Sequence, residues 1–137
     1  MKSFFEEVGT YLNFKRIELI EKDFRLTNLL FLLSKNEFFS TKFLFKGGTC
    51  LIKSYLSYFR FSEDLDFTWK DQSIFDNKSM KKIRILLSDL IDSVGKIIED
   101  VASLANLEFI CNKNDRKYVQ LGGSNKIVTF KLYYNSV

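Results

Sequence analysis

The chain has 137 residues and a net charge of +4, and its 46% hydrophobic and 16% aromatic content predicts one folded domain rather than a disordered chain. No apolar run approaches the ~18 residues that a membrane-spanning helix needs, and acidic residues stand near the N-terminus where a signal peptide has its apolar stretch. We therefore expect a cytoplasmic protein. The sequence contains no histidine, which excludes serine–histidine and cysteine–histidine catalysis and histidine-based metal sites.

Hydrophobic periodicity predicts the elements in chain order. Leucines at helical spacing predict a helix over residues 21–34, and a short β-prone apolar run predicts a buried strand at 42–46. A second helix is expected to start near Thr49, with an apolar stripe of Leu51, Ile52, Tyr55, Leu56 and Phe59. A strand at 65–69, a polar loop at 70–78 and a long helix ending near residue 104 follow. Strands at 107–111, 117–121 and 127–134 complete the expected order, which after the first helix is β-α-β-α-β-β-β. This order predicts the α/β (α+β) class, with a small mixed sheet flanked by helices.

The positive charge is concentrated near the C-terminus. Residues 112–137 contain five basic residues against one acidic residue, so the rest of the chain is neutral. A basic segment of this kind suits a polyanionic partner such as RNA. A lysine-covered face turned toward solvent is an equally open interpretation.

Two short motifs stand close together between residues 45 and 69. Gly47 and Gly48 end the expected strand and open the next helix, where the backbone can approach a ligand and free N–H groups favour an anion. Asp64 and Asp66 present two carboxylates to one face of the following strand, and such a pair suits Mg²⁺ bound to substrate phosphates. Taken singly, the motifs are also compatible with a simple turn and a solvated strand end. Together they predict a metal–nucleotide site at one end of the sheet.

The residues "FKGGTCLIKSY" (45–55) and "RFSEDLDFTW" (60–69) closely resemble the AbiEii/AbiGii-type toxin nucleotidyltransferases of abortive-infection and type IV toxin–antitoxin systems. The upstream segment "EKDFRLTNLLFLL" is similar to the first helix of that family. The resemblance implies membership of the polymerase-β-like nucleotidyltransferase superfamily. It also implies transfer of a nucleoside monophosphate from a nucleoside triphosphate to an acceptor such as tRNA, and an antitoxin protein as a partner.

Carried over to this sequence, the resemblance assigns contacts with the nucleotide phosphates to Gly47, Gly48 and Thr49. It assigns Mg²⁺ binding and catalysis to Asp64 and Asp66, with one or two metal ions. Four further polar residues would join the nucleotide site: Lys46, Lys53, Arg60 and Ser62. A surface charge for Lys53 and a structural ion pair for Arg60 are equally open alternatives.

The sequence departs from the family pattern at the third carboxylate. The corresponding stretch "TFKLYYN" (129–135) has Tyr133 where the family has an acid, and Glu108 replaces that acid only if its strand lies beside Asp66. The helical portion that follows in family members has no counterpart in residues 1–137, so we expect a truncated, single nucleotidyltransferase-like domain. Two hypotheses follow: a nucleotidyltransferase that binds Mg²⁺ and nucleotide, or a catalytically inactive fold retained as a nucleic-acid- or protein-binding module that uses residues 112–137.

Overall fold

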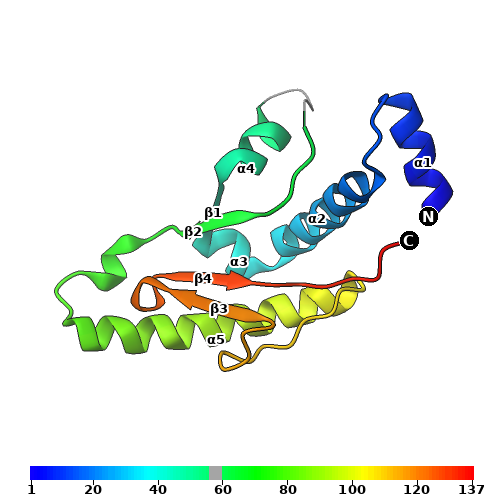
Figure 1. Ribbon diagram of the computed structural model, residues 1–137. Coiled ribbons are helices and arrows are strands. Elements are labelled where there is room, and N and C mark those ends of the chain that lie inside the picture. Colours follow the sequence, from blue (N-terminus) through cyan, green and yellow to red (C-terminus); the bar gives the residue numbers. More distant parts are fainter. Residues whose placement is uncertain (56–59) are drawn as a thin grey trace.

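Five α-helices and four short strands make up the part of the chain that the computed structural model describes, residues 1–55 and 60–137 (Figure 1). The helices are α1 (Lys2–Tyr11), α2 (Ile17–Lys35), α3 (Glu37–Lys42), α4 (Gly47–Ser54) and α5 (Met80–Leu104). The strands are β1 (Phe43–Lys46), β2 (Asp66–Trp69), β3 (Val119–Gly122) and β4 (Ile127–Phe130). Short 3-10 helices span Gln72–Phe75 and Gly123–Asn125.

The strands form two separate antiparallel pairs, β1 with β2 and β3 with β4. The expected α/β (α+β) class is confirmed, whereas the expectation of one mixed sheet is wrong. A cause lies in residues 107–111, which we expected to form a strand. Two of their backbone groups are used locally, because Leu107 N donates to Ala102 O at the end of α5 and Ile110 O accepts from Asn112 N. In the described part of the chain, this segment pairs with another only at a single antiparallel bridge between Glu108 and Tyr133.

Most predicted elements are present with shifted ends. The strand expected at 127–134 ends at Phe130, and the helix expected from Thr49 onward begins at Gly47 and ends at Ser54. Leu56 and Phe59, which we assigned to its apolar stripe, lie outside the described residues. Helices α1 and α3 were missed. Helix α3 is only six residues long, which is too short to show a helical period. It begins at a side-chain cap, where Asn36 Oδ1 accepts from Phe39 N at 2.9 Å.

The core joins the two strand pairs through α2, α3 and α5. Its buried side chains come from α2, α5, β3 and the segment that precedes β3, with Phe39 of α3 among them. Phe39 packs against Phe43 of β1 and Phe67 of β2, with ring centres 4.7 and 4.8 Å apart, so α3 lies on the β1–β2 pair. On the other side, β4 approaches α5, since a side chain at Gly95 would contact Cys111 and Phe130.

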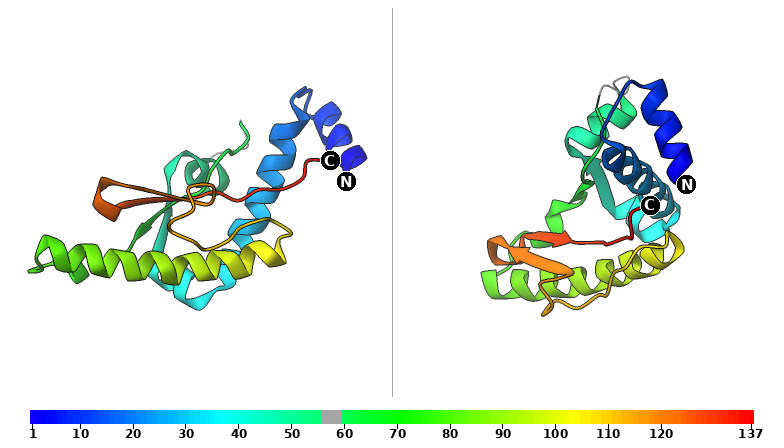
Figure 2. Two further views of the ribbon diagram at one scale, coloured as in Figure 1. Left: turned by 60° about the horizontal axis from the view of Figure 1, so that its bottom comes forward. Right: turned by 45° about the vertical axis from the view of Figure 1, so that its right-hand side comes forward.

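The views in Figure 2 show the same division, with β3–β4 running along α5 and α4 standing at the far end of β1 and β2. The connection from β1 to α4 and the start of β2 is therefore held at the edge of the molecule, away from the main core. Among the described helices, none is long and apolar enough to cross a membrane.

Candidate functional site

The turn from β1 into α4 is built on Gly47. Lys46 is in extended conformation before the helix, and Gly47 then takes a φ of +78°, a left-handed conformation that glycine adopts without strain. A side chain at Gly47 would overlap the Asp66 carboxylate, and its Cβ would lie 3.1 Å from the Cβ of Asp66. Glycine is therefore required here twice, by backbone conformation and by the close approach of Asp66.

Asp66 is brought to this turn by strand pairing. It is the first residue of β2 and stands directly opposite Lys46, the last residue of β1. Opposite residues in an antiparallel pair share a face, so Lys46 and Asp66 are neighbours beside Gly47. The Asp66 side chain is exposed rather than turned into the core. The expectation that the glycine turn and the acidic motif meet at one end of a sheet is thus confirmed for Gly47 and Asp66.

Asp64 precedes β2 in a segment without regular secondary structure and is also exposed. No cluster of three or more Asp, Glu, Cys or His side chains suited to a metal occurs in the described part of the chain. Two accessible carboxylates are a donor set that fits Mg²⁺ in the form in which it accompanies nucleotides, since that ion takes its other ligands from water and phosphate oxygens. Asp64 and Asp66 are the residues that would hold it.

A guanidinium group lies over the second glycine of the turn. A side chain at Gly48 would overlap Nη2 of Arg60, so Arg60 reaches back to the first turn of α4. The N–H groups at the start of a helix and its positive dipole end favour anions, and an arginine at the same place adds a charge suited to phosphate. Arg60 is exposed and accessible for this role.

Lys53 and Ser62 are held differently. The Lys53 ammonium donates to Asp23 Oδ1 at 3.1 Å and to Thr27 Oγ1 at 2.7 Å, and its side chain is only 8% exposed. Ser62 N donates to the same Asp23 oxygen at 2.8 Å, and Ser62 is buried. The geometry thus supports a buried ion pair with α2 for Lys53, an alternative that the sequence did not suggest. Thr49, expected at the phosphates, is also buried, at 2% exposure.

The two residues considered for the third carboxylate, Tyr133 and Glu108, contact each other and the segment before β3. The backbone of Tyr133 pairs with that of Glu108, and the Tyr133 hydroxyl donates to Lys117 O at 2.9 Å. The Glu108 carboxylate accepts from Lys117 Nζ at 2.5 Å and from the Tyr118 hydroxyl. The hydrogen bonds from Lys117 and then Tyr118 hold the pKa of Glu108 below its usual value. Glu108 therefore pairs with the C-terminal segment and not with β2. A position beside Asp66 on β2 was the condition for Glu108 to replace the missing acid.

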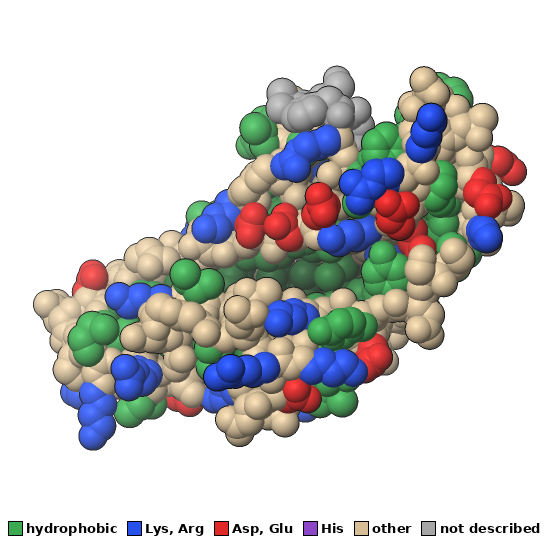
Figure 3. Space-filling view, in the orientation of Figure 1, with side chains coloured by type: hydrophobic (Ala, Val, Ile, Leu, Met, Phe, Trp, Pro, Cys, Tyr) green, Lys and Arg blue, Asp and Glu red, His purple; other side chains and the backbone are tan. Residues whose placement is uncertain are grey.

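A basic cavity of about 680 Å³ lies beside β3. Its lining includes three cationic side chains and no acidic one: Lys113, Arg116 and Lys131. Two of these side chains are oriented by hydrogen bonds, since Lys113 Nζ contacts Asp92 Oδ2 at 2.5 Å and Lys131 Nζ donates to Arg116 O at 3.4 Å. Figure 3 shows several Lys and Arg side chains gathered on the part of the face formed by the C-terminal segment and α5.

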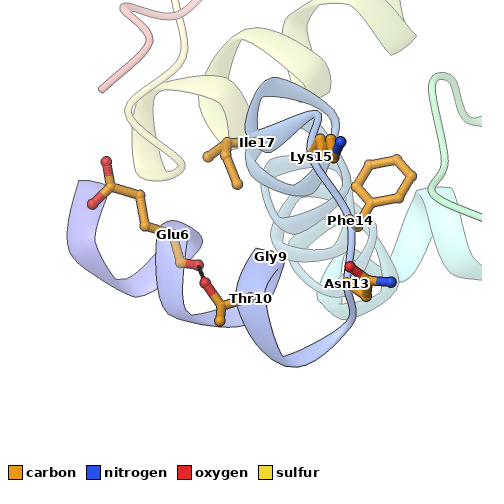
Figure 4. Close-up of a pocket in the computed structure, with 7 residues that line it drawn as sticks. All are labelled: Glu6, Gly9, Thr10, Asn13, Phe14, Lys15 and Ile17. Atoms are coloured by element: carbon orange, nitrogen blue, oxygen red, sulfur yellow. Dashed lines mark hydrogen bonds between the residues drawn. The ribbon is translucent and has the colours of Figure 1, made fainter.

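A second cavity, of about 400 Å³, lies where α1 turns into α2 (Figure 4). Thr10, on its wall, donates to the backbone oxygen of Glu6 at 2.9 Å, and Phe14 and Ile17 supply apolar surface. None of the residues expected at the functional site lines this cavity. It brings together no carboxylate pair and no cluster of cations, so its geometry suggests no chemistry.

Sequence reasoning missed Asp23. It stands in "EKDFRLT", a segment that we compared with a family helix without assigning roles to its residues. The sequence shows an acidic residue within an amphipathic helix. The structure shows that this residue is 6% exposed. Burial of an aspartate requires a partner, but helical periodicity does not say which one.

Comparison with known proteins agrees with the resemblance of the two motifs. The search of curated proteins and the search of solved structures gave no match. Residues 29–124 match the family described as "Nucleotidyl transferase AbiEii toxin, Type IV TA system". This match includes the glycine turn, Arg60 and both site aspartates. The chain therefore belongs to the AbiEii family of nucleotidyl transferase toxins.

Proposed function

We propose that this chain binds a nucleoside triphosphate with Mg²⁺ at the edge formed by Gly47, Gly48, Asp64 and Asp66, as a nucleotidyltransferase-like toxin of a type IV toxin–antitoxin pair. The observation that carries the proposal is the contact between Gly47 and Asp66. It places a helix N-terminus suited to phosphate directly beside a carboxylate suited to the accompanying metal. The family match supports the same class of activity.

In this proposal, cationic groups would bind the phosphates and carboxylates would bind the metal. The backbone N–H groups at the start of α4 would receive phosphate oxygens, and the exposed side chains of Arg60 and Lys46 would balance their charge. Asp64 and Asp66 would hold the metal. Bound Mg²⁺ would neutralise charge on the phosphates and orient them for attack by an acceptor hydroxyl.

Partners follow from the same proposal. The family description names a toxin–antitoxin system, so an antitoxin protein is the expected protein partner. The acceptor would be an RNA such as tRNA, and the cavity lined by Lys113, Arg116 and Lys131 offers it a cationic surface. A protein acting on these partners would work in the cytoplasm.

The test is isothermal titration of the protein with each nucleoside triphosphate, with and without Mg²⁺. We expect binding that Mg²⁺ strengthens, and we expect Asp66→Asn to remove the Mg²⁺ dependence while a weaker, metal-independent affinity persists. The matched control is Asp89→Asn, which changes an exposed aspartate on α5 far from the site in sequence. Mg²⁺ dependence that survives in Asp66→Asn would place the metal elsewhere.

A second candidate function is a catalytically inactive fold that binds RNA or protein. The specific observation in its favour is that Tyr133 and Glu108 both form hydrogen bonds with Lys117 or Tyr118. Neither residue would then act beside Asp66 as the general base that takes the proton from the acceptor hydroxyl. In that case nucleotide binding would persist without transfer, and the basic cavity would be the functional surface.

A further inference from the structure

The carboxylate of Asp23 is buried between three segments that are distant in sequence. Asp23 lies on α2 and is 6% exposed. A single oxygen, Oδ1, accepts from Lys53 Nζ, 30 residues away, and from Ser62 N, 39 residues away. Thr27, one helical turn further along α2, accepts a second hydrogen bond from the Lys53 ammonium. One carboxylate is therefore shared between α4 and the segment that leads to β2.

These two attachments lie on the two halves of the candidate site. Lys53 is in the last turn of α4, the helix whose first residues are Gly47 and Gly48. Ser62 stands shortly before Asp64 and Asp66 in a segment without regular secondary structure. Hydrogen bonds from both to Asp23 fix the helix and this segment to one point on α2. The distance between the glycine turn and the acid pair thus depends on Asp23, which belongs to neither motif.

The ion pair is well suited to hold a geometry. Its side chains are 8% and 9% exposed, so salt screens it weakly and solvent competes little for its hydrogen bonds. The amide of Ser62 adds a bond with fixed backbone direction, which a mobile side-chain pair alone would not give.

We propose that Asp23 is a positioning residue that sets the affinity of the site for Mg²⁺ and nucleoside triphosphate without touching either. The inference rests on the proposed nucleotide site. It extends that site to α2, beyond the two motifs and the residues that the family resemblance assigns.

The experiment compares Asp23→Asn and Asp23→Glu with a control in the same helix, Glu21→Gln. Glu21 is also buried but contacts Arg25 and Ser136 instead of the site, so its replacement reports the cost of disturbing a buried acid on α2. Each variant is characterised by thermal unfolding, by titration with Mg²⁺ and ATP and the other triphosphates at a temperature where it is folded, and by hydrogen exchange of the amides of residues 60–67 in the nucleotide-free protein.

We expect both Asp23 variants to bind the triphosphate about ten- to a hundred-fold more weakly, which is the usual cost of removing a group that orients a ligand-binding residue. We also expect faster exchange at Ser62 and Asp64, whereas Glu21→Gln should lose comparable stability with unchanged affinity and unchanged exchange there. If Asp23→Asn does not fold, Asp23→Glu, which keeps the charge and lengthens the side chain, decides the matter. Wild-type affinity in a folded Asp23 variant would overturn the inference.

The exchange measurement separates this inference from the proposed function. If the wild-type chain binds no triphosphate, the proposed function fails. Faster exchange at residues 62–66 in Asp23→Asn, with α5 still protected, would then support the bracing geometry alone. Unchanged exchange at residues 62–66 would overturn the positioning role whatever the nucleotide titration shows.

Discussion

At the scale of single residues, position 133 separates an enzyme from a binding module. The resemblance calls for a carboxylate there, and the chain has a phenol, which offers one oxygen where a carboxylate offers two. The ring of Tyr133 also faces a cation, since Lys117 Nζ lies 5.3 Å from its centre. We therefore expect a carboxylate introduced at this position to form an ion pair with the Lys117 ammonium.

We expect the unmodified chain to transfer little or no labelled nucleoside monophosphate to RNA, because loss of a general base typically costs about 10²–10⁴-fold in rate. Tyr133→Glu should raise the rate, and Tyr133→Glu combined with Lys117→Met should raise it further by leaving the new carboxylate unpaired. The control is Tyr133→Phe, which removes the hydroxyl without adding an acid. Robust transfer by the unmodified chain, abolished by Asp64→Ala, would show that the third acid is dispensable.

The residues of the site differ in how far sequence could predict them. Gly47 and Asp66 were predictable, because a glycine turn and a strand acid separated by one helix meet through local geometry. The burial of Lys53 was not, because a lysine in a short helix looks the same in sequence whether it points to solvent or to an aspartate 30 residues earlier. Asp23 was missed for the same reason.

At the scale of elements, the β3–β4 pair and the segment before it carry the cationic cavity. Arg116 is exposed, and Lys131 lies beside its backbone, so both offer charge to a ligand in the cavity. Lys113 is partly neutralised by Asp92 and so contributes less. The surface is thus suited to a chain of phosphates, with Arg116 and Lys131 as its main contributors.

We expect the double variant Arg116→Ala and Lys131→Ala to bind single-stranded RNA more weakly and to lower the slope of log affinity against log salt by about 1.4, which corresponds to two lost phosphate contacts. Filter binding at several salt concentrations measures both quantities. The charge-matched control is Lys2→Ala with Lys15→Ala, which removes two exposed cations from α1 and the loop after it. An equal loss in the control would mean that net charge, not the cavity, governs binding.

The predicted elements show a related limit. Long periodic segments such as α5 were found, while the pairing of the strands was not. Strand pairing depends on where backbone groups are used. In this segment Leu107 N donates to the end of α5, and Ile110 O accepts from Asn112 N in a local turn. A hydrophobic alternation in sequence does not contain that information.

At the scale of the whole molecule, Glu21 ties the C-terminal segment to α2. Its carboxylate accepts from Ser136 Oγ at 2.7 Å, from Val137 N at 3.3 Å and from Arg25 at 2.9 Å, and it is 1% exposed. Burial acts to raise the pKa of Glu21, but the hydrogen bonds from Ser136, Arg25 and Val137 outweigh it and hold the pKa below its usual value. The ionised form is therefore the one that the fold stabilises.

A carboxyl with a lowered pKa contributes stability above its unfolded pKa and loses that contribution as the pH falls through its folded pKa. We therefore expect the free energy of unfolding of the wild-type chain to exceed that of Glu21→Gln at pH 6 to 7, and the difference to shrink between about pH 5 and pH 3. Urea unfolding at a series of pH values measures it. The control is Glu18→Gln, which changes an exposed ion pair with Arg16 and should alter stability by no more than about 1 kcal/mol throughout. A difference that stays constant with pH would show that Glu21 acts by shape alone.

The shared oxygen of Asp23 has a practical consequence for anyone who prepares a shorter piece of this protein. The family match begins at residue 29, so a piece cut at that boundary would retain the glycine turn and both site aspartates but would begin after Asp23. The Lys53 ammonium and the Ser62 amide would then both lose the Asp23 oxygen that they share, and the ammonium would also lose the Thr27 hydroxyl. Such a piece would contain every residue of the glycine and aspartate motifs and would still lack the residue that joins α4 to the segment before β2.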